Sequence, residues 1–168
     1  MFLYYLYSLL TAPGVVVHEF GHLIFCWLAG VKVHQIKLFQ LGKTTAGFVI
    51  HDEPSKFYQA ILISFGPLIL NSLLALLCFS QFKPPYYQWP LFIYLWLGIA
   101  VGLHAIPSTG DAKSLLQTTN HRIWRNPLIL IGYPFVLFLY FLNLLRRIHF
   151  DFVYVAALFW LSNWYLKG

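Results

Sequence analysis

Long runs of apolar residues, separated by short polar segments, dominate the chain. These runs cover residues 2–29, 59–82, 91–101, 127–145 and 151–166. About 20 consecutive apolar residues are enough for a helix to cross the hydrocarbon core of a bilayer. The pattern therefore predicts an all-α integral membrane protein with about five transmembrane helices, formed by residues 1–168 as a single membrane-embedded domain.

The third apolar run is interrupted by His104-Ala-Ile-Pro-Ser-Thr-Gly-Asp111 and continues as a polar half-helix over residues 112–120. Pro107 and Gly110 both argue against a continuous helix. Irregular backbone at membrane depth is tolerated only where it is buried in protein or lines a wet cavity. We therefore expect a broken helix at a functional site.

Two further breaks separate the predicted elements. Thr11-Ala-Pro-Gly14 either kinks one long helix or caps a new one that starts near Pro13. Residues 30–57 form the one sizeable polar connection, in which residues 31–39 alternate like a strand and residues 44–50 could pair with them. This pattern predicts a small cytoplasmic β-hairpin.

The composition agrees with a membrane protein and defines an orientation. The chain is 60% hydrophobic and 10% charged, against about 25% charged in soluble domains. The net charge of +6 indicates anionic lipid rather than nucleic acid, because the basic residues flank the apolar runs. Five spans with the N-terminus outside place most of them in the cytoplasm: Lys32, Lys37, Lys43, Lys56, Lys113, Arg122, Arg125 and Lys167. Lys83, Arg146 and Arg147 then lie outside, so we predict a multi-pass protein whose site opens toward the cytoplasm.

The candidate chemistry begins with His18, Glu19 and His22, an H-E-x-x-H inside an apolar helix. Histidines four residues apart share one helix face, so both imidazoles can bind one Zn²⁺ while Glu19 acts as a base for its water. An unpaired carboxylate at the centre of a membrane helix costs about 2.5–3.5 kcal/mol. This cost favours a metal site over an incidental pair of histidines.

Asp111 is the natural third ligand, because it is predicted to lie at the same depth as His18. His18 is about 16 Å from the helix end at Ala29, and Asp111 is about 15 Å from the loop near His121. A catalytic zinc site needs three protein ligands and one open position. The alternative is that Asp111 merely caps the polar half-helix.

Two other side chains compete for a place at the metal. His104 could be a third ligand, although we interpret it as a residue that lines the site or orients a ligand. Cys26, one turn beyond His22, could be a soft ligand, but a small buried hydrophobic residue is the simpler interpretation.

Three motifs together resemble the site-2 protease family of intramembrane metalloproteases. They are His18-Glu19-Phe20-Gly21-His22, Gly66-Pro67-Leu68, and His104-Ala-Ile-Pro107 followed by Gly110-Asp111. The resemblance covers a catalytic core of residues 14–120, leaves residues 127–166 as accessory helices, and includes no PDZ domain. It implies that Glu19 is catalytic, that His18, His22 and Asp111 bind one Zn²⁺ per chain, and that an edge strand over Thr45–Ile50 can bind unwound substrate.

The expected function is hydrolysis of peptide bonds in or near transmembrane segments of membrane-protein substrates. The expected partners are such a substrate and the lipid bilayer. One alternative is a non-catalytic zinc-binding relative, in which His104 or Cys26 closes the fourth position. A metal transporter is a further alternative, but it should have polar residues across the whole membrane thickness.

Overall fold

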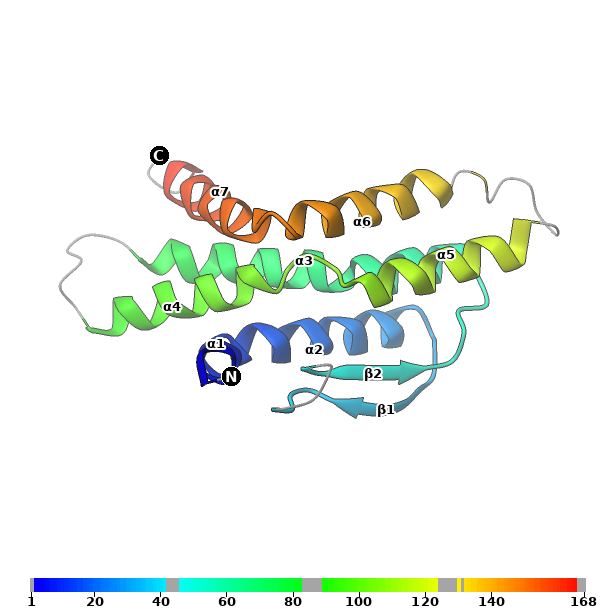
Figure 1. Ribbon diagram of the computed structural model, residues 1–168, viewed down its shortest axis with the longest axis horizontal. Coiled ribbons are helices and arrows are strands. Elements are labelled where there is room, and N and C mark those ends of the chain that lie inside the picture. The colour runs from blue at the N-terminus through cyan, green and yellow to red at the C-terminus, as the bar shows by residue number, and fades with distance from the viewer. Residues whose placement is uncertain (1, 42–45, 83–88, 124–129, 131, 166–168) are drawn as a thin grey trace.

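The computed structural model describes residues 2–41, 46–82, 89–123, 130 and 132–165 as an elongated helical bundle with one small hairpin (Figure 1). The elements are α1 (Phe2–Leu10), α2 (Ala12–Leu28), β1 (Val33–Lys37), β2 (Phe48–His51), α3 (Phe57–Gln81), α4 (Trp89–Leu103), α5 (Thr109–Ile123), α6 (Gly132–Arg146) and α7 (Phe150–Tyr165). The predicted helical fold with a small hairpin is confirmed. The expected turn over residues 83–90 and the strand residues Thr44 and Thr45 lie mostly or wholly outside the described residues.

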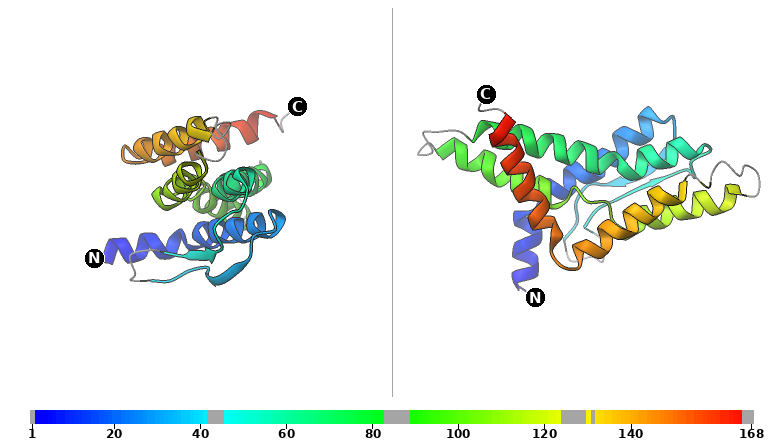
Figure 2. Two further views of the ribbon diagram at one scale, coloured as in Figure 1. Left: turned by 90° about the vertical axis from the view of Figure 1, so that its right-hand side faces the viewer. Right: turned by 90° about the horizontal axis from the view of Figure 1, so that it is seen from above.

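The N-terminal apolar run forms two helices rather than one. Thr11 separates them, and Pro13 lies in the first turn of α2, where its missing N–H leaves no bond unmade. Figure 2 shows α1 turning sharply away from the axis of α2. The sequence had left a kink and a new helix open, and the structure shows a new helix.

Small residues bring α2, α3 and α4 into close contact. A Cβ atom at Gly14 would overlap the carbonyl oxygen of Ala100, and one at Gly21 would lie 3.0 Å from the Cα atom of Pro67. The buried amide of Asn71 donates to the carbonyl oxygens of Gly14 at 3.2 Å and Val101 at 3.0 Å. Asn71 therefore links the three helices at the point where their backbones approach most closely.

The hairpin folds back along α2. Strands β1 and β2 pair antiparallel, from Val33 opposite His51 to Lys37 opposite Phe48. Figure 1 shows both strands running beside α2. A Cβ atom at Gly47, just before β2, would lie 2.6 Å from the Cγ atom of Glu19. The predicted hairpin thus reaches the depth of the H-E-x-x-H motif.

The predicted broken helix is present as α4 and α5, with residues 104–108 between them. Helices α6 and α7 are also separated by a short turn, in which His149 has a φ of 59°. Asn143 near the end of α6 donates to the Pro107 carbonyl at 3.1 Å, so the two breaks lie side by side. From there α7 continues over α3, where Tyr154 meets Ser72 at 2.7 Å.

Buried apolar residues form a core at each end of the bundle. Near α7 this core consists of Ala75, Phe79, Val101, Leu103, Val155 and Leu158. Near α6 it consists of Ala60, Ala112, Leu115, Val136 and Leu139. Within the described residues, α3 is the one helix both long and apolar enough to cross a membrane by itself, and α2, α4 and α6 are shorter apolar helices. The count of five spans stays a prediction.

Candidate metal centre

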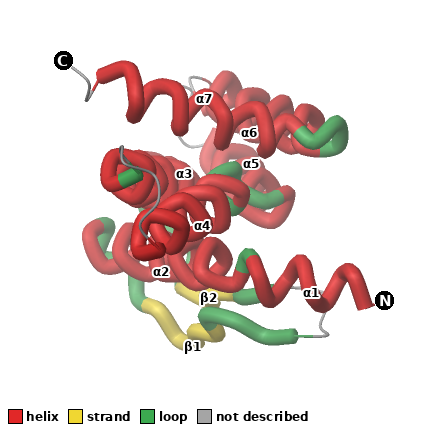
Figure 3. Tube along the Cα trace, turned by 90° about the vertical axis from the view of Figure 1, so that its left-hand side faces the viewer, coloured by secondary structure: helices red, strands yellow, loops and turns green. Residues whose placement is uncertain are grey.

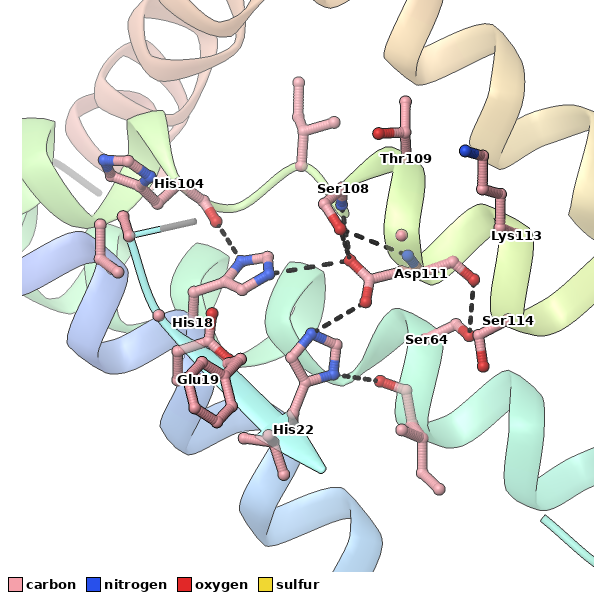
Figure 4. Close-up of a pocket in the computed structure, with 18 of the residues that line it drawn as sticks. His18, Glu19, His22, Ser64, His104, Ser108, Thr109, Asp111, Lys113 and Ser114 are labelled. Carbon is pink, nitrogen blue, oxygen red and sulfur yellow. Dashed lines mark hydrogen bonds and ion pairs between the residues drawn. The ribbon is translucent and has the colours of Figure 1, made fainter. Parts of the chain in front are cut away.

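The structure brings His18, His22 and Asp111 together from two distant parts of the chain. Their candidate ligand atoms all lie within 4.8 Å of one another. His18 Nε2 is 3.8 Å from Asp111 Oδ2, and His22 Nε2 is 3.1 Å from Asp111 Oδ1. Figure 4 shows both imidazoles of α2 facing the carboxylate at the start of α5. The three predicted ligands therefore lie together in the folded chain.

Backbone carbonyls fix the tautomer of both imidazoles. His18 Nδ1 donates to the carbonyl of His104 at 2.6 Å, and His22 Nδ1 donates to the carbonyl of Ile63 at 3.0 Å. A carbonyl oxygen only accepts, so each Nδ1 carries a proton, and in the neutral form of each ring the Nε2 lone pair is directed toward Asp111. This is the orientation that histidine ligands of metals usually have.

Breaks in helical hydrogen bonding supply both carbonyls. In a regular helix the N–H of residue 67 would bond to Ile63, but Pro67 has no N–H. Continuation of α4 would likewise bond the Ser108 N–H to His104, but that N–H donates to Asp111 instead. The Gly-Pro motif and the helix break therefore each free one acceptor for one imidazole.

Asp111 is held by a capping box at the start of α5. The backbone N–H and the hydroxyl of Ser108 donate to Asp111 Oδ2 at 2.6 and 2.7 Å, and the Asp111 N–H donates back to Ser108 Oγ at 3.3 Å. Asp111 thus takes part in capping the half-helix and also faces His22 with Oδ1 and His18 with Oδ2. The two interpretations left open by the sequence are compatible.

The donor set fits a divalent metal such as zinc. Tetrahedral ligands at zinc bond lengths lie about 3.3 Å apart, and one ligand atom from each of the three residues already lies within 4.8 Å of the other two. Two Nε2 lone pairs that point at a carboxylate repel it, unless a proton or a cation lies between them. Two imidazoles and one carboxylate are also the ligand set of many catalytic zinc sites.

Glu19 lies beside these ligands, and its carboxylate has no hydrogen-bond or ion-pair partner within the described chain. The residue is 8% exposed and lines a cavity of about 770 Å³ together with the three ligands. The backbone at Gly47 lies against both the Cγ atom and the carboxyl carbon of Glu19. Glu19 is thus shielded by the hairpin, while its carboxylate faces the cavity.

The two competing ligands do not join this group. Cys26 is fully buried in an apolar cluster with Ala29, Val31 and Ile63. The His104 ring packs against Gly14, and its Nε2 is buried without a partner; its carbonyl, not its ring, contacts His18. The sequence analysis did not identify Ser108, although the S-x-x-D spacing of a capping box was a signal for it.

A membrane-type helical bundle that holds an H-E-x-x-H pair and a distant carboxylate around a cavity has the construction of a membrane-embedded metallopeptidase. The family model described as Peptidase M50B-like matches residues 2–109. The chain belongs to this family, as a member of the site-2 protease group that its motifs resemble. The match includes the H-E-x-x-H and Gly-Pro motifs and ends just before Asp111, whose place rests on the geometry. No curated protein and no solved structure matches the chain.

Proposed function

We propose that the chain is a zinc-dependent endopeptidase that cleaves peptide bonds in or near transmembrane segments of membrane proteins. His18, His22 and Asp111 are the proposed ligands, and Glu19 is the proposed general base. The observation that carries the proposal is the meeting of two correctly oriented imidazoles with one carboxylate, next to an unpartnered carboxylate in a cavity. Because the His104 ring and Cys26 stay outside this group, the open position that catalysis needs is favoured over a closed structural site.

The residues of the chain divide the catalytic work. Zinc, when bound, supplies a Lewis acid and lowers the pKa of a coordinated water toward neutrality. Glu19 takes a proton from the attacking water and returns it to the leaving amine. The carbonyls of Ile63 and His104 keep the two imidazoles oriented throughout. Ser108 prevents the Asp111 carboxylate from rotating away.

Substrate must be unwound, since a helical peptide bond is shielded and its carbonyl is already hydrogen-bonded. Strand β2 has one partner in the described sheet, and Phe48, Val49 and His51 of this strand line the cavity. An extended peptide could therefore add to the free edge of β2 next to Glu19. We also propose that the cavity opens toward the cytoplasm, in agreement with the distribution of basic residues.

Two variants of the purified protein test the mechanism and the ligand set separately. Glu19→Gln should retain bound zinc and lose cleavage of a transmembrane substrate, by at least about 100-fold for a general base. Asp111→Ala should lose zinc, as measured by metal analysis after dialysis. Cleavage by Glu19→Gln at the parental rate would exclude Glu19 as the general base. An unchanged zinc content in Asp111→Ala would exclude Asp111 as the third ligand.

A further inference from the structure

Arg146 is a cation on the wall of the cavity that holds the candidate metal ligands. Asn143, one turn earlier in α6, bonds to the Pro107 carbonyl, which fixes this end of α6 beside the helix break. Arg146 is half-buried and forms no ion pair or side-chain hydrogen bond in the described chain. All five acidic side chains lie within that described part, and none of them pairs with this guanidinium.

An unpaired arginine on the wall of a cavity inside the bundle calls for a ligand. Charged residues inside membrane bundles are costly, face the interior or a water-filled cavity, and mark sites of function. A favourable interaction with the C-terminal dipole of α6 is the simpler explanation. However, Arg147 lies next to it, is exposed, and could provide the same interaction from outside the cavity. The dipole therefore does not explain why Arg146, rather than Arg147 alone, lines this cavity.

The charge on the cavity wall indicates what the ligand is. Glu19 and Asp111 line the cavity and already have proposed roles at the metal and the water. The remaining charged groups are Arg146 and Lys113, and Figure 4 shows Lys113 on the far side of Asp111 from the two imidazoles. A guanidinium binds a carboxylate through two parallel hydrogen bonds. A cavity of about 770 Å³ is large enough to hold a peptide segment beside it.

We propose that Arg146 binds an acidic side chain of the substrate, so that the chain selects membrane peptides with Asp or Glu close to the scissile bond. This specificity rests on the proposed peptidase function. The substrate backbone would lie along β2, and its carboxylate would reach the wall formed by the end of α6.

Binding tests this proposal without depending on turnover. The probe is a fluorescent single-span peptide in phosphatidylcholine vesicles, with Glu, Gln or Lys placed at each position near the centre of its span. Zinc-loaded Glu19→Gln protein should bind the Glu peptide roughly tenfold more tightly than the Gln peptide at one or two positions. Adding Arg146→Gln should abolish this preference, and Arg146→Glu should reverse it in favour of Lys. Arg147→Gln is the matched control and should leave it unchanged.

Each other outcome has a definite meaning. Absence of a Glu preference at every position, or its survival in Arg146→Gln, would overturn the proposal. The proposal would also be overturned if the binding preference depended on a free peptide C-terminus and disappeared when that C-terminus was amidated. An effect of Arg146 that depends on added phosphatidylglycerol and not on peptide charge would assign the arginine to lipid phosphate. The reversal in Arg146→Glu is a gain of binding, which a misfolded variant cannot produce.

Cleavage by the parent protein separates this inference from the proposed function. A Glu preference in binding with no cleavage of any peptide would support the carboxylate site and contradict the proposed peptidase function. Cleavage of the Glu and Gln peptides at equal rates would support the peptidase function and contradict the carboxylate site at Arg146.

Discussion

Pro67 acts on the candidate metal centre through the hydrogen bond that it cannot donate. Its missing N–H leaves the carbonyl of Ile63 without a helical partner, and His22 Nδ1 donates to this oxygen at 3.0 Å. The helix remains continuous around the proline, and Gly21 allows α2 to pack directly against the Pro67 backbone. One residue thus orients a ligand that lies on another helix.

Pro67→Ala restores the N–H that competes with His22 for the Ile63 carbonyl. We expect the zinc affinity to fall about 10- to 100-fold, as is usual when a partner of a metal-binding histidine is perturbed. The measurement is competition against a chelator of known affinity. Pro134→Ala is the control, since Pro134 lies in the first turn of α6, where an N–H has no helical partner. Equal zinc affinity in Pro67→Ala and the parent would contradict this role.

Ser108→Ala removes one of the two donors that hold Asp111 Oδ2. The loss of an N-cap hydroxyl lowers the free energy of unfolding by about 1 kcal/mol, and the freed carboxylate should also bind zinc more weakly. Thermal unfolding in detergent and zinc titration measure the two effects. Ser108→Thr keeps a hydroxyl and should retain both the stability and the zinc affinity of the parent. If Ser108→Thr were as impaired as Ser108→Ala, the capping box would be contradicted.

At the scale of elements, the contact of α2 with α4 depends on Gly14. A methyl group there would overlap the Ala100 carbonyl oxygen, which is backbone and cannot rotate away. We expect Gly14→Ala to lower the free energy of unfolding by about 1–3 kcal/mol. Because the end of α4 carries the carbonyl that orients His18, zinc binding should weaken as well. Phe20→Ala, on the exposed side of α2, should change zinc binding little.

The hairpin carries a pH-dependent contact outside the membrane helices. His34 Nε2 donates to Asp52 Oδ1 at 2.6 Å, and this hydrogen bond lowers the pKa of the exposed Asp52 carboxyl. A lowered pKa in the folded chain means that the contact stabilises the hairpin at neutral pH and is lost as the pH falls through that value. An NMR titration of Asp52 should show this, and His34→Gln should return the pKa toward its ordinary range. An unchanged pKa in His34→Gln would exclude the contact.

Local sequence signals predicted the elements but not their packing. The i, i+4 histidines and Pro107 are local features, and they indicated the ligand helix and the break correctly. Gly110 was expected in the unwound backbone, but it lies in the first turn of α5, which begins at Thr109. The role of the Ile63 carbonyl depends on α2 lying across α3, and no periodicity encodes that contact. For the same reason the sequence predicted the hairpin but not that Gly47 would meet Glu19.

At the scale of the whole molecule, α6 and α7 lie one after the other along the bundle, each against a different end of α3. The α6 core residues lie with Ala60 of α3 and Leu115 of α5, whereas α7 packs near Phe79, toward the opposite end of α3. Figure 1 shows the two helices in succession along the upper face, with α7 above the left half of the bundle and α1 at the lower face of the same half. The sequence analysis expected two separate spans here, which would place the chain ends on opposite sides of the membrane.

Cysteine labelling distinguishes these two topologies. In a Cys78→Ala background with the fully buried Cys26 retained, single cysteines replace Leu6, Glu53 and Trp164, which are all exposed. If α6 and α7 cross the membrane once together, a membrane-impermeant maleimide should label positions 6 and 164 from outside the cell and position 53 only after lysis. Labelling of position 164 together with position 53 would instead support five spans.

A single shared crossing would also place the break between α6 and α7 at the depth of the metal ligands, because Asn143 beside this break bonds to the Pro107 carbonyl. Arg146 would then lie at the same depth. The labelling pattern therefore decides whether this arginine is an intramembrane group or lies near the outer surface.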